Sequence, residues 1–301
     1  MEKNNNRNSL VSTCKIIEKG GIIHSIPSSA LSFWLGAFNM QSVLSHIQVN
    51  VPFTMLCEKY LDQFIKYSLN PEIGFDALAL ERYSLSDFNK IATKLHQHHL
   101  TITFHAPFID LSPGSPDPSI RAITRHRFEQ VLQLIPIFKP KTVVCHAGYD
   151  RKRYLFIKDI WFENSVSMWS WLGTCLKEER VLLVLENGFE DDPEDLRILF
   201  ENLEKKNVGF CLDVGHQAVF SSLSLETWLE SLGKYLKQVH LHDNNGREDS
   251  HLALGKGRIN FPVLFNYLKT TKKHPPVITL EPHREEDLWP SVEYLKKVWP
   301  W

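Results

Sequence analysis

The stretch Val181–His216 reads VLLVLENGFEDDPEDLRILFENLEKKNVGFCLDVGH. It begins with an apolar run, Val181–Glu186, continues through a helical pattern, Pro193–Lys205, and returns to a second apolar run, Val208–Val214. Asp192 directly before the proline is a typical helix start. The order strand, helix, strand predicts two parallel strands, because parallel neighbours need a crossover connection and a helix normally supplies it.

The same alternation recurs along most of the chain. Eight apolar runs predict strands: His46–Val51, Glu72–Leu80, Thr101–Phe108, Thr142–Tyr149, Val181–Glu186, Val208–Val214, Val239–His242 and Val277–Glu281. The helical patterns are Thr54–Ser68, Ser86–His98, Ile120–Phe138, Leu155–Lys177, Pro193–Lys205, Ser224–Lys237, Phe261–Thr271 and Glu286–Val298. Eight such units predict an α/β fold, the closed (β/α)8 TIM barrel. The alternative, an open doubly wound sheet, does not require eight units, and no GxGxxG motif follows the first strand.

The chain divides into two parts by composition. Residues 1–44 are polar, Asn-rich at the start, and lack sustained periodicity. We therefore expect an N-terminal extension there, partly disordered or packed on the barrel. Residues 45–301 are expected to form the barrel as a single domain.

Composition limits the partners of the protein. Lys plus Arg (34) nearly equals Asp plus Glu (35), so the chain has no overall attraction for nucleic acid or for an anionic membrane. Five widely spaced cysteines without a CxxC pair indicate neither a disulfide framework nor a thiolate zinc site. We expect a cytoplasmic protein without a transmembrane span that acts on a small molecule; the oligomeric state is not indicated.

Polar side chains follow six successive predicted strands. They are His105, His146, Glu186 with Asn187, Asp213 with His216, His240 with His242, and Glu281. In a barrel these strand ends converge on one rim, where active sites are built. A single strand-end histidine is more often structural, but so many carboxylates and imidazoles around one cavity need counter-charge, which divalent cations supply most simply. Nitrogen and oxygen ligands without thiolate suit Zn²⁺, Mn²⁺ or Fe²⁺ better than Ca²⁺.

The stretch Gln238–Gly257, QVHLHDNNGREDSHLALGKG, adds Asp249 and His251 to this set. Lys256 and Arg258 lie in the turn that follows and are candidates to bind a substrate phosphate near the metals. Exposed basic residues are more often solvated surface. Asn187 and His242, next to strand-end ligands, are further candidates for substrate binding.

This pattern resembles the xylose-isomerase-like TIM-barrel superfamily over about residues 45–298. The superfamily includes endonuclease IV, also called AP endonuclease family 2, and many sugar or sugar-phosphate isomerases and epimerases. Resemblance to endonuclease IV implies three zinc ions. The first would lie at His105, His146 and Glu186, the second at Glu186, Asp213, His240 and Glu281, and the third at His216, Asp249 and His251.

Resemblance to the epimerases implies a different use of the same residues. One Mn²⁺-like ion would be held by Glu186, Asp213, His240 and Glu281. The catalytic residues would then be the two glutamates, as acid and base on opposite faces of the substrate, and His216, which would contact the substrate.

The sequence departs from the repair enzymes in two loops. Their His-Leu-Asn-Asp motif is His240-Leu241-His242-Asp243 here, and their Tyr-Leu loop is replaced by Phe108–Gly114, in which Asp110 adds negative charge. The sequence therefore favours a metal-dependent isomerase or epimerase of a sugar, sugar phosphate or polyol, with one to three divalent ions. The alternative is a multi-zinc phosphodiesterase of the endonuclease IV type. Asp249 and His251 separate the two, because a one-metal enzyme needs no third site.

Overall fold

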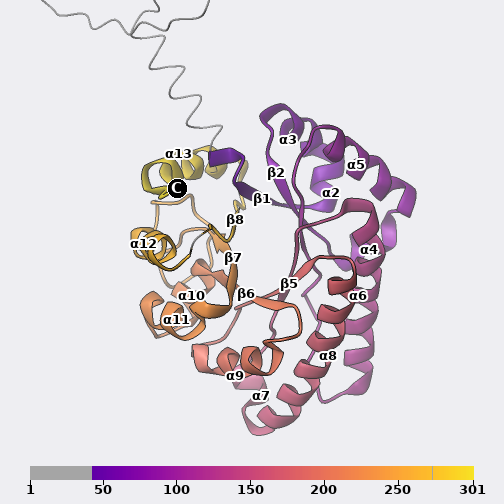
Figure 1. The fold of residues 1–301 in the computed structure, drawn as a ribbon, viewed down its shortest axis with the longest axis vertical. Helices are drawn as coiled ribbons and strands as arrows, with labels where there is room; N and C mark the ends of the chain where they lie inside the picture. Colours follow the sequence, from indigo (N-terminus) through magenta and orange to yellow (C-terminus); the bar gives the residue numbers. More distant parts are fainter. Residues whose placement is uncertain (1–42, 273) are drawn as a thin grey trace, which may run out of the picture. The chain divides into compact units, whose positions relative to one another are not determined.

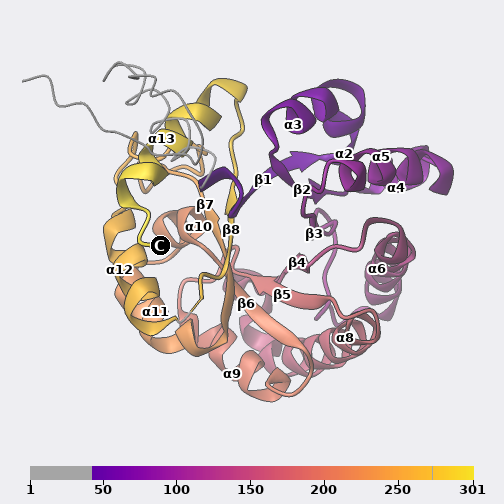
Figure 2. The same cartoon turned by 45° about the horizontal axis from the view of Figure 1, so that its top comes forward.

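The structure, a computed structural model, describes residues 43–272 and 274–301. The described chain forms a closed barrel of parallel strands in which each strand pairs with the next, and β8 (Val277–Leu280) pairs with β1 (Ile47–Pro52). The other strands are β2 (Asn70–Gly74), β3 (Thr103–His105), β4 (Thr142–His146), β5 (Leu182–Glu186), β6 (Val208–Asp213) and β7 (Leu236–Leu241). The predicted TIM barrel is confirmed, and the chain passes once around it in sequence order (Figure 2).

Helices surround the barrel on the outside (Figure 1). The longer ones are α5 (Leu85–Gln97), α6 (Pro118–Phe138), α8 (Lys158–Glu178), α9 (Pro193–Leu203), α11 (Leu225–Leu232), α12 (Phe261–Thr271) and α13 (Leu288–Val298). Several begin at side-chain caps that the sequence encodes. Ser84 and Asp87 form a capping box at α5, and Asp192 accepts a hydrogen bond from the backbone of Glu194 at α9.

Some predicted boundaries are wrong. The second strand ends at Gly74 rather than Leu80, because the Asp76 side chain caps a short helix, α4 (Ala77–Arg82). The helix predicted to reach Lys237 ends at Leu232, and β7 begins at Leu236. The first predicted helix is divided into α2 (Phe53–Met55), a π-helical turn (Leu56–Tyr60) and α3 (Leu61–Tyr67). A short helix that the sequence did not predict, α10 (Val214–Phe220), follows β6 directly.

The apolar core lies between strands and helices, whereas part of the barrel interior is polar. Gln238 of β7 accepts a hydrogen bond from Thr142 of β4 and donates one to Glu72 of β2. These strands are not neighbours, so the bonds cross the inside of the barrel. All three side chains are buried, and their hydrogen bonds offset the cost of removing them from water.

Most of the predicted N-terminal extension lies outside the described residues. Of residues 1–44, only Val43 and Leu44 are described, and both are buried in a helical turn. The boundary at residue 45 therefore stays a prediction. Among the described helices, none combines the length and apolar character needed to cross a membrane. The predicted cytoplasmic location is not tested by this finding.

Candidate metal centre

The carboxyl ends of the strands bring all nine predicted metal ligands together. His105, His146, Glu186 and Asp213 end β3, β4, β5 and β6, and Glu281 follows β8. A cavity of about 360 Å³ opens at this rim, and seven of the nine residues line it. The remaining two, Asp213 and His240, are not part of the lining and have 0 % of their surface exposed. Among the described residues, four overlapping sets drawn from these side chains and His242 have ligand atoms close enough together to hold an ion, and none of the four contains a cysteine.

The first group consists of His105, His146 and Glu186. Nε2 of His105 lies 3.1 Å, and Nε2 of His146 lies 3.5 Å, from Oε2 of Glu186. The Nδ1 atom of His105 lies 3.1 Å from the carbonyl oxygen of Ala106, which leaves Nε2 for the cavity. Burial lowers the pKa of His146 to about 4, so this imidazole is neutral and can act as a ligand near pH 7.

The second group consists of Glu186, Asp213, His240 and Glu281. Nδ1 of His240 lies 3.2 Å from Oε1 of Glu186 and 3.0 Å from Oε1 of Glu281. Burial alone would raise the pKa of Glu186, but the neighbouring imidazoles outweigh it and hold that pKa well below its usual value. Burial also tends to raise the pKa of Glu281, but the effect of His240 is larger and lowers that pKa below its usual value. Both carboxylates are therefore ionised and can bind a cation.

Asp213 is fixed by its neighbours before any ion binds. Its backbone N–H donates to Oδ1 of Asn187, and the Asn187 side chain donates to the Asp213 carbonyl oxygen, both at 2.9 Å. Oδ1 of Asp213 accepts a hydrogen bond from the backbone of His216 and so caps α10. Its Oδ2 is buried without a hydrogen-bond partner. Asn187, which we predicted to bind substrate, makes structural bonds here; its role toward substrate stays a prediction.

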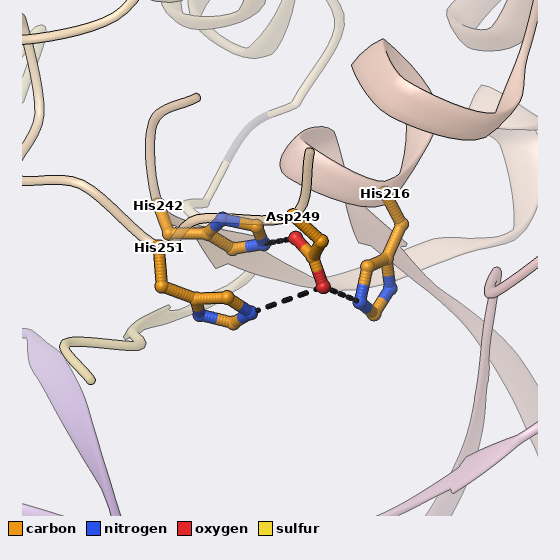
Figure 3. A group of neighbouring side chains, drawn as sticks. All are labelled: His216, His242, Asp249 and His251. Atoms are coloured by element: carbon orange, nitrogen blue, oxygen red, sulfur yellow. Dashed lines mark ion pairs between the residues drawn. The ribbon is translucent and has the colours of Figure 1, made fainter. Parts of the chain in front are cut away.

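The third group surrounds Asp249 with imidazoles (Figure 3). Oδ2 of Asp249 lies 3.3 Å from Nε2 of both His216 and His251, and Oδ1 lies 3.7 Å from Nε2 of His242. The rings of His242 and His251 stack at 3.6 Å, and Gly215 leaves the space that the His242 ring fills. The sequence predicted that His242 binds substrate. In the structure its Nε2 lies between Asp249 and Asp213, 3.1 Å from Oδ1 of Asp213, and its role toward substrate stays a prediction.

Asp243 holds the loop that carries the third group. Its Oδ1 accepts hydrogen bonds from the backbone of Asn244 and Ile259, and its Oδ2 accepts them from Gly255 and Gly257. Its own backbone pairs with Leu252 in both directions. These bonds fold residues 244–257 back over the strand ends, which brings Asp249 and His251 to the cavity.

The two predicted phosphate-binding residues lie elsewhere. Arg258 lines a separate groove beside α10 and α11, where its side chain lies against Gly246. Lys256 is exposed and is not part of the cavity lining. Among the described residues that line the metal cavity there is no lysine or arginine. Phosphate binding by Lys256 and Arg258 therefore stays a prediction that this geometry does not support.

Sequence reasoning missed two features of the site. Glu72 lies beneath His240 at 0 % exposure, and its only sequence signal was a carboxylate inside an apolar run. Aromatic side chains flank the cavity: Phe108 stacks on His146 at 4.2 Å, and Phe189 lies edge-on to Phe220. No motif identifies these rings, because their positions depend on loop conformation.

A family model, the xylose isomerase-like TIM barrel, matches residues 71–298. The chain belongs to this family. Among its relatives, the uncharacterized protein MJ1311 of Methanocaldococcus jannaschii is 29% identical over 209 residues, covering 67% of this chain and 71% of the relative. A probable endonuclease 4 of Symbiobacterium thermophilum is 24% identical over 235 residues, covering 67% of this chain and 79% of the relative.

Solved structures of similar fold include a zinc-soaked protein and an epimerase-like protein. The TTHB071 protein of Thermus thermophilus, soaked with ZnCl2, has a TM-score of 0.72 and 24% identity, covering 84% of this chain and 98% of its own. A D-tagatose 3-epimerase-like protein has a TM-score of 0.69 and 25% identity, covering 84% and 97%. The family is therefore enzymatic and contains both epimerases and endonucleases.

We expect Asp243→Asn to lower both stability and metal binding. The amide nitrogen of asparagine would face backbone N–H groups that now donate to a carboxylate, and a lost hydrogen bond to a charged group costs about 1.5–3 kcal/mol. Urea unfolding measures the first effect, and zinc bound per chain measures the second. Asp192→Asn is the control, because asparagine caps a helix as well as aspartate does. Equal behaviour of the two variants would contradict the proposed role of Asp243.

Glu190 should make stability fall as pH rises. Burial raises the pKa of Glu190 to about 7, although the backbone N–H groups of Gly188 and Tyr149 donate to it. The pKa of a glutamate in the unfolded chain is roughly 4.3. As pH rises from there to 7, the folded chain keeps the proton on Glu190 that the unfolded chain has lost, so the free energy of unfolding decreases by up to roughly 3 kcal/mol. Glu190→Gln keeps an acceptor oxygen and cannot ionise. Urea midpoints at pH 5 and pH 8 should differ less in this variant than in the wild type or in the exposed control Glu194→Gln; parallel profiles would refute the effect.

Proposed function

We propose that the protein is a divalent-metal-dependent hydrolase that cleaves a small phosphodiester with more than one ion. The observation that carries this proposal is Asp249 between His216, His242 and His251. A one-ion epimerase site needs only the second group, and this chain holds two further groups at the same rim. Zinc-type and manganese-type ions suit the nitrogen and oxygen donors present.

The buried polar atoms of the centre fit metal binding. Oδ2 of Asp213 and Oδ1 of Asp249 are both buried without a hydrogen-bond partner. Such atoms are rare in folded proteins, because each loses its hydration without replacement. The two carboxylate oxygens belong to two different groups, so a single ion bound in one group would leave the oxygen of the other group without a partner. The donors therefore support ions at more than one position.

Charge balance connects the number of ions to the substrate. The three groups contain four carboxylates: Glu186, Asp213, Asp249 and Glu281. Three divalent ions would exceed these charges by two and would attract an anionic phosphodiester without help from lysine or arginine. One ion would leave two of these negative charges to be balanced by protons on imidazoles, because neighbouring carboxylates outweigh burial and raise the pKa of His216 and of His251. Such a centre would have no net positive charge to attract a sugar phosphate. The lack of basic residues in the lining thus fits either several ions with a phosphodiester or one ion with a neutral sugar.

Bound ions would stabilise the attacking and leaving oxygens of an in-line displacement at phosphorus. The protein would contribute the remaining features. Glu186 and Glu281 would stay ionised and hold an ion, because neighbouring imidazoles lower the pKa of both carboxylates, and the flat face of Phe108 over His146 would exclude water from one side. The small cavity and the net charge of −1 support a small substrate rather than duplex DNA.

Epimerisation of a neutral sugar is the second candidate. Its support is the second group, in which Glu186 and Glu281 both approach His240 and could act as base and acid on one substrate. This reaction would leave Asp249 and His251 without a catalytic purpose. The two candidates therefore differ in how many ions activity requires.

Asp249→Asn should remove one ion and most hydrolysis. Loss of a residue that only supports a ligand typically costs 10–100-fold, so loss of a ligand should lower hydrolysis of bis(4-nitrophenyl) phosphate at least about 100-fold. Elemental analysis should find up to three ions per wild-type chain and one fewer in the variant. Glu248→Gln is the matched control, because Glu248 is exposed in the same loop. One ion per wild-type chain, with conversion of a neutral ketose unaffected in Asp249→Asn, would favour the epimerase instead.

A further inference from the structure

Glu72 is a fully buried carboxylate beneath the metal centre. It lies in β2 with 0 % of its surface exposed, and it does not line the cavity. Neither the sequence pattern nor the resemblance to the family placed it in the site. A buried carboxylate costs several kcal/mol unless its neighbours compensate it, so its surroundings indicate its role.

Five side chains from four strands contact the two oxygens of Glu72. Oε1 lies 3.2 Å from Nδ2 of Asn50 and 3.1 Å from Nε2 of His240. Oε2 accepts hydrogen bonds from Gln238 at 2.5 Å, Thr103 at 3.0 Å and Thr279 at 3.1 Å. Both oxygens are therefore already engaged by protein donors. Glu72 is not available as a metal ligand, and it acts only as an acceptor.

The two nitrogens of His240 face opposite ways. Nδ1 points to the carboxylates of Glu186 and Glu281, where the second group would hold an ion. Nε2 points away from the cavity, where Oε1 of Glu72 and the amide nitrogen of Gln238 each lie 3.1 Å from it. The two hydrogens of that amide have acceptors in Glu72 and Thr279, so Glu72 is the acceptor that faces Nε2. A neutral imidazole carries one hydrogen and one lone pair, so the partner of one nitrogen determines what the other can do.

We propose that Glu72 is a positioning residue that fixes His240 with its hydrogen on Nε2 and its lone pair on Nδ1. The inference rests on the metal-dependent function proposed above, but it is independent of whether the reaction is hydrolysis or epimerisation. An acceptor behind a ligating histidine orients the ring and makes the ligand more basic. Four donors hold Glu72 itself, so the ring orientation is set by the barrel interior rather than by a mobile loop.

The wild-type protein loaded with Zn²⁺ gives the first test. Long-range proton–nitrogen NMR of the histidine rings distinguishes the metal-bound nitrogen from the protonated one, and His240→Asn identifies the signals of His240. We expect zinc on Nδ1 and hydrogen on Nε2. Zinc on Nε2 would overturn the proposal, and this measurement needs no change at Glu72.

Glu72→Gln gives the second test. Competition with a chelator should show a 10–100-fold loss of zinc affinity at the second group, because the amide can offer Nε2 only a weaker acceptor. Thr103→Val is the matched control, since it removes a donor to the same carboxylate without touching His240. Its zinc affinity should stay within about threefold of wild type. Wild-type zinc affinity in Glu72→Gln, or an equal loss of affinity in both variants, would show that Glu72 packs the barrel interior without positioning His240.

A double variant tests rescue. Nε2 of Gln238 lies 3.1 Å from Nε2 of His240, so Glu72→Gln with Gln238→Glu returns a carboxylate to the same ring nitrogen. If Glu72→Gln lowers zinc affinity 100-fold, the double variant should bind zinc at least tenfold more tightly than Glu72→Gln alone. Equal affinity of the two variants would contradict the proposal. If Glu72→Gln alone fails to fold, the double variant and the wild-type NMR still decide. None of these measurements uses a substrate, so they remain informative if the proposed hydrolysis fails.

Discussion

The carboxylate of Glu186 is the interaction on which the rest of the centre depends. Its Oε2 faces His105 and His146, and its Oε1 faces His240. Only 1 % of the residue is exposed, and the imidazoles around it keep it ionised. A charge buried this deeply needs opposite charge or strong hydrogen bonds within a few ångströms. Glu186 therefore links the first and second groups and fixes the distance between them.

The barrel meets this requirement through bonds between strands. Asn187 joins the ends of β5 and β6 by exchanging hydrogen bonds with the backbone of Asp213, and Glu72 connects β2 to His240 across the interior. The third group is built differently. Asp249 and His251 come from a loop, and four backbone donors to Asp243 hold that loop in place. The first two groups are thus positioned by the sheet, whereas two members of the third, Asp249 and His251, depend on the buried carboxylate of Asp243.

This difference explains what the sequence could predict. The alternation of strands and helices predicted the barrel, and the rule that parallel strand ends meet at one rim predicted that His105, His146 and Glu186 would converge. The end of β2 was misplaced because the apolar run continues past Asp76, which caps a helix instead. Glu72 and the place of His242 could not be predicted, because both depend on side chains from distant strands or on the space above Gly215. Local patterns contain no information about such contacts.

The donor types of the groups give the centre a chemical asymmetry. The second group offers three carboxylates and one imidazole, whereas the third offers three imidazoles and one carboxylate. Carboxylate oxygens suit manganese and imidazole nitrogens suit zinc, so the two positions differ in the ions that they favour. Protons also compete with metals for imidazole at higher pH than for carboxylate. Acidification would therefore weaken the third group, which has three imidazoles, before the second group, which has one.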